Sequence, residues 1–380
     1  MEYTLTATCH FGCESVLKRE LMDLGFDIIR VTDGHIEYKS DAAGIFRSNL
    51  WLRTAERVQI NMIEFTAYTF DELYENIYAF DWVEILPPDA NFVINGRSYN
   101  SKLFSISDCQ RITEKAIIDK LNVTYNKDYY EKTGKKFNFE ISIVNDFATL
   151  YLDSSGAGLH KRGYRTTQGA APLKETLAAS MINLSVWNKD RALYDPFCGS
   201  GTILIEAAMI ARNIAPGILR RFNCEHFDFL DKSEFRTIRK EAKDGIDRDS
   251  KLNIKGSDYD RSMILKARNN TQNMNLENDI FLFTKEVRKV ELEDEYGVII
   301  TNPPYGIRLD DDTLDRTYNN FKALLDKLPT WSVYMITDYE KVTDVFSKPD
   351  KNRKLYNGKI KTYFYSYLGP RPPKEFYGKF

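Results

Sequence analysis

The spacing of apolar and polar positions changes once along the chain. Up to about residue 155, short strand-like runs with a period of two alternate with single amphipathic helices. From Ala171 onward, short apolar β-branched runs are each followed by a longer helical stretch, which is typical of parallel α/β units. The pattern therefore predicts small α+β units first and a larger parallel sheet after them.

Two α+β units are predicted in the first part, over residues 1–43 and 44–155. Asp33-Gly34 joins two strands of the first unit as a hairpin turn. The expected strands are 3–8, 28–32, 35–38, 56–65, 91–98, 137–144 and 147–152, and the expected helices are 11–24, 46–52, 70–79 and 107–121, the last capped by Ser107 and Asp108.

The second part is predicted to be one α/β domain over residues 171–380. A Gly- and Ser-rich segment that turns basic, residues 156–170, is interpreted as the linker before it, and residues 213–250 as a charged insertion within it. Asn357-Gly358 is a strong hairpin signal near the end of the chain. The expected strands are 192–194, 253–258, 280–284, 297–301, 332–337, 353–356 and 359–367, and the expected helices are 173–185, 203–212, 261–274, 315–327 and 339–347.

Composition narrows the class of protein. The 380 residues suffice for two or three domains, and a net charge of −2 means that any nucleic-acid surface must be local. The five cysteines are odd in number and irregularly spaced, which favours free thiols and indicates no metal site. The chain has no signal-peptide pattern and no apolar run of membrane-spanning length, so we expect a cytoplasmic protein without a membrane partner.

A rigid loop is predicted directly after the strand at 297–301. Pro303 lacks an N–H and keeps Asn302 out of the helical region, and Pro304 stiffens the turn further. The Asn302 side-chain oxygen and the loop carbonyls are acceptors that suit a planar group bearing an NH2, and Tyr305 offers a flat face. The alternative interpretation of Asn302-Pro303-Pro304-Tyr305 is a Pro-rich turn with a packed tyrosine.

A second candidate segment, Asp195-Pro196-Phe197-Cys198-Gly199-Ser200-Gly201-Thr202, lies between a strand and a helix. Gly199 and Gly201 allow the backbone to approach a ligand closely, yet the spacing fits neither a dinucleotide fingerprint nor a P-loop. Asp258 ends the next strand, where a carboxylate can accept both hydroxyls of a ribose. The alternative roles are a helix cap for Asp258 and core packing for Phe197.

These segments resemble class I S-adenosylmethionine-dependent methyltransferases that modify exocyclic amino groups. Asp195 to Thr202 and Asn302 to Gly306 carry that likeness. Three further segments are similar to the THUMP-domain RNA methyltransferases, and among these to the RlmL-type guanine-N2 enzymes of large-subunit ribosomal RNA: Cys9-His10-Phe11-Gly12 with Glu14, Leu159 to Arg165, and Pro172 to Ala179.

The resemblance implies a Rossmann-like class I methyltransferase domain with a C-terminal antiparallel hairpin, preceded by ferredoxin-like and THUMP domains. It implies S-adenosyl-L-methionine as cofactor, bound by Asp195, Phe197, Cys198, Gly199, Gly201, Asp258 and Asn302, and a catalytic loop of Asn302, Pro303, Pro304 and Tyr305. The family's acid beside the adenine has no clear match, and Glu286 is the nearest candidate.

We expect RNA to be the partner, with contacts from Lys161, Arg162, Tyr164 and Arg165. Further cations in the second unit are Lys102, Arg111, Lys115, Lys132, Lys135 and Lys136, each of which alone fits a solvated surface residue equally well. The expected reaction is methyl transfer to the N2 amine of guanine in 23S ribosomal RNA. The alternatives are a tRNA guanine-N2 methyltransferase, a DNA amino-methyltransferase and a non-catalytic RNA-binding assembly factor.

Overall fold

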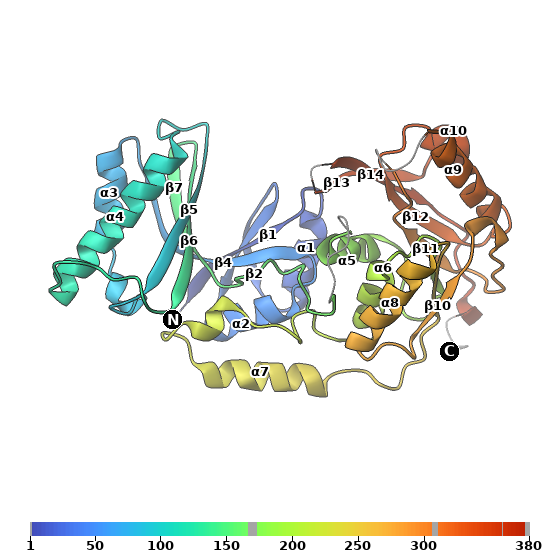
Figure 1. Cartoon of the computed structure of the whole chain (residues 1–380), viewed down its shortest axis with the longest axis horizontal. Helices are drawn as coiled ribbons and strands as arrows, with labels where there is room; N and C mark the ends of the chain where they lie inside the picture. Colours follow the sequence, from blue (N-terminus) through green and yellow to red (C-terminus); the bar gives the residue numbers. More distant parts are fainter. Residues whose placement is uncertain (1, 166–172, 306–310, 359, 377–380) are drawn as a thin grey trace.

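The computed structural model describes residues 2–165, 173–305, 311–358 and 360–376. Its strands form two seven-stranded sheets, one built from each part of the chain (Figure 1). The end of the predicted linker, Pro172 and Gly306 lie outside the described residues. Among the helices of the described segments, none combines the length and the apolar character that crossing a membrane requires.

The N-terminal sheet runs through both predicted α+β units without a break. Its central strand β4, Ala55–Thr66, pairs with β1 over its first half and with β7 over its second half. The strand order is β2-β3-β1-β4-β7-β6-β5, antiparallel except for β5 and β6. The other strands are β1 Tyr3–Cys9, β2 Asp27–Thr32, β3 His35–Ser40, β5 Asn91–Tyr99, β6 Lys136–Val144 and β7 Phe147–Asp153.

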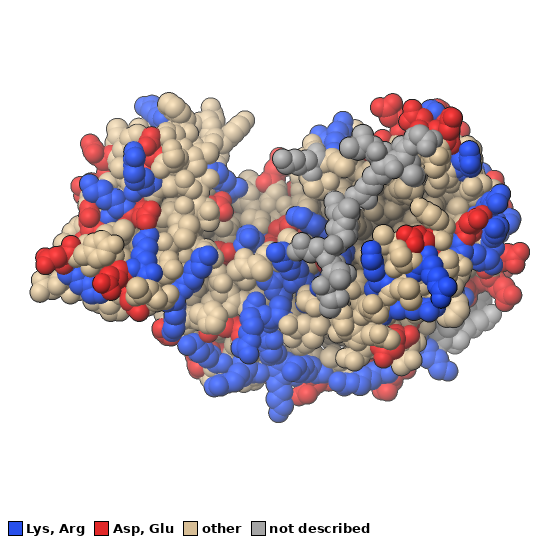
Figure 2. Space-filling view, viewed as in Figure 1, with Lys and Arg blue, Asp and Glu red and all other residues tan. Residues whose placement is uncertain are grey.

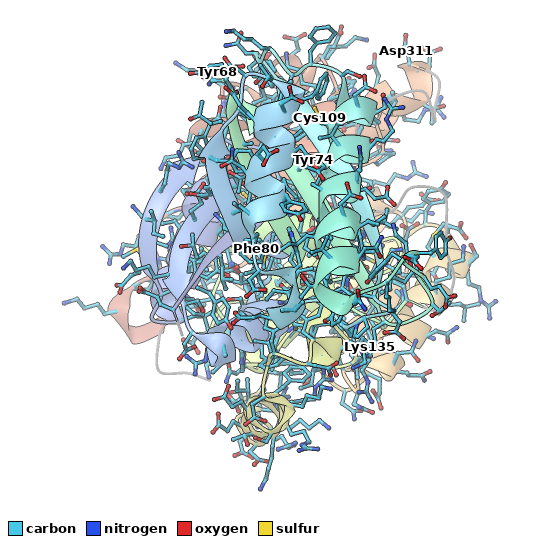
Figure 3. All side chains as sticks on the ribbon, turned by 90° about the vertical axis from the view of Figure 1, so that its left-hand side faces the viewer. Tyr68, Tyr74, Phe80, Cys109, Lys135 and Asp311 are labelled. Carbon is cyan, nitrogen blue, oxygen red and sulfur yellow. The ribbon has the colours of Figure 1, made fainter. Side chains whose placement is uncertain are left out.

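Helices cover this sheet where the sequence predicts them. Helix α3, Phe70–Ala79, has the predicted bounds because Thr69 and Glu72 form a capping box at its start. Helix α4, Ile106–Tyr125, begins after Ser105 and not at the predicted caps Ser107 and Asp108. Figure 3 looks onto the face that α3 and α4 cover. The remaining helices are α1 Glu14–Asp23 and α2 Ala42–Trp51.

The C-terminal sheet has the predicted mixed topology, in the order β10-β9-β8-β11-β12-β14-β13. The first five strands are parallel, and β14 runs antiparallel to β12 and to β13, which confirms the terminal hairpin. The strands are β8 Leu193–Asp195, β9 Ile254–Asp258, β10 Ile280–Thr284, β11 Val298–Thr301, β12 Ser332–Thr337, β13 Lys351–Asn357 and β14 Ile360–Tyr367; the helices are α5 Glu175–Leu184, α6 Thr202–Ala211, α8 Arg261–Asn273, α9 Asp311–Leu325 and α10 Val342–Phe346.

The charged insertion reaches back to the first half of the chain. Its helix α7, Lys232–Asp244, packs against α2, and the rings of Phe46 and Phe235 stack 4.8 Å apart (Figure 1). Figure 2 shows Lys and Arg side chains gathered across the lower middle of the molecule, in the region where Figure 1 places α7. The cations are therefore concentrated locally although the whole chain carries a net charge of −2.

Candidate active site

The three candidate segments meet at one edge of the C-terminal sheet. Strand β8 pairs in parallel with β9 on one side and with β11 on the other. The carboxyl ends of parallel neighbours point the same way, so Asp195, Asp258 and Thr301 lie side by side. The sequence prediction of one shared edge is confirmed.

The glycine-rich turn after β8 leaves room for a ligand. Gly199 and Gly201 have φ values of +51° and +82°, in the left-handed region that favours glycine. A Cβ at Gly199 would meet no described atom within 4 Å, so space is open above this residue, whereas one at Gly201 would lie 3.2 Å from the Ala267 Cβ. Gly199 thus faces the site, and Gly201 allows α6 to pack closely on α8.

Asp258 is held beside this turn. Its carboxylate accepts a hydrogen bond from the Gly199 N–H at 3.1 Å and another from the Asp260 N–H at 2.9 Å. The cap of α8 is Asp260, which accepts from the Ser262 N–H at 2.7 Å. The helix-cap alternative for Asp258 is therefore excluded, and its carboxylate lies next to the open space at Gly199.

Two carboxyl groups with raised pKa values occupy this edge. Asp195 is 2% exposed, and its Oδ1 accepts from Thr301 Oγ1 at 2.6 Å and from the Phe197 N–H at 3.0 Å. Burial raises the pKa of Asp195 from 3.8 to about 7, and burial also raises the pKa of Asp258. Buried carboxyl groups with perturbed pKa values at one edge of a sheet are typical of a functional site.

The loop after β11 presents an unused acceptor. Asn302 Oδ1 is buried and finds no hydrogen-bond partner among the residues that the structure describes. The loop is supported by α9 and β12, because Tyr318 Oη of α9 donates to the Pro304 carbonyl at 3.2 Å and lies 2.5 Å from Thr337 Oγ1 of β12. Buried acceptors are nearly always paired in native proteins, so this oxygen indicates a place for a donor from a ligand.

Tyr305 is packed and not open to solvent. It is 9% exposed, and its hydroxyl accepts a hydrogen bond from Asn357 Nδ2 at 2.6 Å. The structure thus places Tyr305 as the packed tyrosine of the alternative interpretation and not as an exposed stacking face. It also joins the loop to the turn of the terminal hairpin, a contact that the sequence did not suggest.

The remaining predicted cofactor residues lie at the same edge of the sheet, but they differ in how far they are buried. Phe197 is partly buried, and its ring meets Phe321 edge-on at 5.4 Å, while Cys198 is 6% exposed. Glu286 follows β10 at the neighbouring strand end, but it is exposed and forms ion pairs with Arg288 and Lys289 at 2.9 and 3.2 Å. Phe197 therefore combines core packing with a position at the site.

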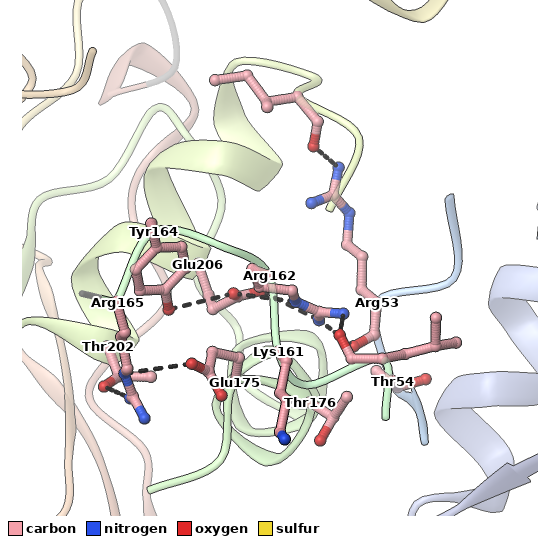
Figure 4. Close-up of polar contacts among 12 residues, drawn as sticks. Arg53, Thr54, Lys161, Arg162, Tyr164, Arg165, Glu175, Thr176, Thr202 and Glu206 are labelled. Carbon is pink, nitrogen blue, oxygen red and sulfur yellow. Dashed lines mark hydrogen bonds and ion pairs between the residues drawn. The ribbon is translucent and has the colours of Figure 1, made fainter. Parts of the chain in front are cut away.

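Two of the four predicted RNA-contacting residues of the linker are buried and a third is partly buried, which corrects that prediction (Figure 4). Arg162 is 2% exposed and forms an ion pair with the buried Glu206 of α6 at 3.3 Å, and Tyr164 is fully buried with its hydroxyl 3.4 Å from the same carboxylate. Arg165 pairs with Glu175 at 3.2 Å and donates to Thr202. Of the four residues only Lys161 is exposed, because the others fasten the linker to α5 and α6.

Five of the six cations predicted in the second unit contact a carboxylate or an aromatic ring of the fold, and Lys136 is exposed. Figure 3 labels Tyr68, Tyr74 and Lys135 on this part of the molecule. Lys102 and Lys115 lie over the Tyr68 and Tyr74 rings, at 4.6 and 5.7 Å from the ring centroids. Arg111, Lys132 and Lys135 form ion pairs with Asp108, Glu114 and Asp228. These are surface contacts, since the side chains of Arg111 and Lys135 are 76% and 45% exposed, so the prediction that they contact RNA stays a prediction.

Comparison with known proteins assigns a family to each part of the chain. Family models match an RlmL ferredoxin-like domain at residues 4–59, a THUMP domain at 67–153 and an RMKL-like methyltransferase domain at 162–365. The chain is 43% identical over 378 residues to YpsC of Bacillus subtilis (strain 168), described as a candidate RNA methyltransferase, and the match covers 98% of each chain.

Longer relatives and a solved structure extend this comparison. The chain is 34% identical over 314 residues to the ribosomal RNA large subunit methyltransferase K/L of Buchnera aphidicola subsp. Acyrthosiphon pisum (strain APS), covering 80% of this chain but only 45% of that one. The crystal structure of SMU.472, a candidate methyltransferase complexed with SAH, is similar with a TM-score of 0.92 at 40% identity, covering 98% of this chain and 99% of that chain.

Proposed function

Because this chain belongs to the RMKL-like methyltransferase family, we propose that it transfers a methyl group from S-adenosylmethionine to the exocyclic N2 amine of a guanine in large-subunit ribosomal RNA. The coarser part of this statement, an S-adenosylmethionine-dependent RNA methyltransferase, follows from the family and from the SAH-bound relative. The choice of guanine N2 rests on the RlmL-type resemblance, and the choice of ribosomal RNA rests on the K/L relatives.

The unpaired Asn302 Oδ1 is the observation that carries the proposal. It lies at the strand edge shared with Gly199 and Asp258, so an amine donor bound by Asn302 would lie next to the cofactor turn. We assign cofactor binding to Asp195, Phe197, Cys198, Gly199, Gly201 and Asp258, and the catalytic loop to Asn302, Pro303, Pro304 and Tyr305.

The loop overcomes the weak nucleophilicity of the base. When bound, S-adenosylmethionine supplies an electrophilic methyl group on a positively charged sulfur. The lone pair of an exocyclic amine is delocalised into the ring, and N–H donation to Asn302 Oδ1 and to the Pro303 carbonyl would orient it for attack. The same acceptors stabilise the positive charge that develops on nitrogen, so the proton can leave after transfer without a strong general base.

Methyl transfer to RNA from a strain that lacks this gene tests the function directly. With labelled cofactor, Asn302→Ala should lower transfer by roughly 10²- to 10³-fold, the usual loss for one donor or acceptor aimed at developing charge. Calorimetric cofactor binding should change little, since Asp258 and the glycine turn remain. Unchanged transfer in this variant would refute the role of the loop.

Nucleoside mass spectrometry on separated RNA fractions identifies the product. N2-methylguanine in large-subunit ribosomal RNA supports the proposal, and the same nucleoside in tRNA would move the substrate to tRNA. Methylated adenine in DNA would identify a DNA amino-methyltransferase. Absence of single-turnover transfer to any nucleic acid would leave a binding protein that retains a cofactor pocket.

A further inference from the structure

The terminal hairpin, residues 351–367, has a charge unlike that of the rest of the chain. It contains no Asp or Glu and five cations, at positions 351, 353, 354, 359 and 361, together with tyrosines at 356, 363, 365 and 367. The whole chain, in contrast, holds 53 Lys and Arg against 55 Asp and Glu. We call this segment the basic hairpin.

The tip of the basic hairpin projects past the edge of the sheet that holds the candidate active site. Strand β14 pairs with β12 only from Tyr367 to Tyr363, and Tyr363 lies opposite Thr337, the last residue of β12. Beyond that point β14 pairs only with β13, up to Asn357. The hydrogen bond from Asn357 to Tyr305 shows that the overhanging tip reaches the catalytic loop.

One face of this tip interleaves lysines with tyrosines. Lys354 lies opposite Tyr363 and Tyr356 opposite Lys361, and directly opposed residues share a face of the sheet. The Lys354 and Lys361 ammonium groups each lie 5.3 Å from a ring centroid, that of Tyr356 and of Tyr363 respectively. No ion pair joins either lysine to a carboxylate of the described segments. The lysines are exposed and the tyrosines half-buried, so the face is open to a ligand.

The opposite face is fixed to the N-terminal half of the chain. Leu355 is fully buried, and Arg353 donates to the Gly12 carbonyl at 2.7 Å. Gly12 has a φ of +85°, and a Cβ there would lie 2.8 Å from the Lys354 carbonyl. At the border of the exposed face, the Phe11 ring, 45% exposed, meets Tyr356 edge-on at 6.1 Å. The Cys9 to Glu14 segment singled out in the sequence thus anchors the basic hairpin to the N-terminal half of the chain.

We propose that the exposed face of the basic hairpin binds the single strand of RNA that flanks the target nucleotide. Lys354 and Lys361 would contact phosphates, and Tyr356 and Tyr363 would stack on bases. A single strand fits better than a duplex, because only unpaired bases expose their faces to aromatic side chains. The location next to the catalytic loop rests on the proposed function, whereas the binding itself is measured without methyl transfer.

Binding of fluorescein-labelled 20-nucleotide RNA to the full chain tests this surface. Log affinity should fall with log salt, and the Lys354→Ala/Lys361→Ala double variant should reduce the slope by about 1.4, or roughly 0.7 per lost phosphate contact on a single strand. The matched control is Lys322→Ala/Lys327→Ala, at the end of α9 and just after it, which removes the same charge away from the hairpin and should leave the slope unchanged. The same RNA in a duplex should bind more weakly than the single strand.

The tyrosines are tested by paired substitutions. Tyr363→Ala should weaken single-strand binding by about 5- to 100-fold, whereas Tyr363→Phe, which keeps the ring, should bind like the unaltered protein. Cofactor affinity, measured by calorimetry, should be unchanged in every variant and shows that the fold is intact.

The proposal would be overturned by equal slopes in the two double-lysine variants, by equal binding of Tyr363→Ala and the unaltered protein, or by tighter binding of the duplex. A single-stranded DNA of the same sequence that binds more tightly than the RNA would also contradict it. All of these experiments measure RNA binding and none measures methyl transfer. A negative result would therefore refute RNA binding by the hairpin without refuting the proposed methyl transfer.

Discussion

Replacing Arg162 with leucine tests whether the buried ion pair with Glu206 holds the linker to the methyltransferase domain. Arg162 and Glu206 are 2% and 0% exposed. The guanidinium also donates to the carbonyls of Leu159, at 2.8 Å, and of Arg53. The variant leaves the Glu206 carboxylate buried without its cation and these two carbonyls without their donor.

The expected loss of stability is large. Removing one partner of a buried pair typically costs about 3–5 kcal/mol, because the remaining charge is uncompensated. At about 2 °C per kcal/mol for a large domain, the melting temperature should fall by about 6–10 °C. The Arg162→Leu/Glu206→Leu double variant should recover most of this loss, since replacing both charges by apolar groups is often nearly neutral.

Scanning calorimetry of the single and double variants measures these shifts, and Arg221→Leu is the matched control. Arg221 also pairs with a glutamate, Glu225 at 3.2 Å, but its side chain is 86% exposed, so its loss should cost no more than about 1 kcal/mol. If Arg162→Leu costs no more than Arg221→Leu, or if the double variant is less stable than the single one, the reasoning about this joint is wrong.

Two further predictions concern the active-site edge. Burial raises the pKa of Asp195 to about 7, so the stabilisation that the protonated acid provides is complete below about pH 4 and is lost as the pH rises through 7. In melting curves measured without cofactor, Asp195→Asn should flatten this decline of the melting temperature with pH. An unchanged pH profile would contradict the prediction. Tyr318→Phe removes the hydrogen bond to the Pro304 carbonyl, which is worth about 1 kcal/mol. The rate of single-turnover transfer should therefore fall about fivefold, while the cofactor affinity measured by calorimetry stays constant. An equal loss of rate and affinity would indicate general damage to the fold.

The order of elements and most of the strand ends could be predicted from the sequence because each depends on local signals. The capping box at Thr69 and the Asn-Gly turn at 357–358 are examples in which a few residues determine where an element begins or turns. The continuity of the N-terminal sheet could not be predicted, because it depends on the two partners of β4, and partners far apart in sequence leave no trace in the local pattern.

The candidate site likewise has features that the sequence predicts and features that depend on contacts between distant residues. The strand-end positions of Asp195, Asp258 and Asn302 follow from parallel topology, which the alternation of strands and helices predicts. The role of the linker was mispredicted because Arg162 and Arg165 look like surface cations until Glu206 and Glu175, which lie 44 and 10 residues away in sequence, are placed beside them. Tyr318 and Asn357 support the catalytic loop through contacts that no short motif encodes.

The contact between the Gly12 loop and β13 has a consequence for how the protein is made. The two partners are separated by about 340 residues, since Arg353 binds the Gly12 carbonyl. During synthesis the N-terminal sheet is complete at Asp153, long before β13 has been translated. The first half can therefore fold early, as domains on a growing chain generally do, before the Gly12 loop can contact β13. The catalytic loop is tied to that hairpin through Asn357, so it would gain this support only after β13 has been translated.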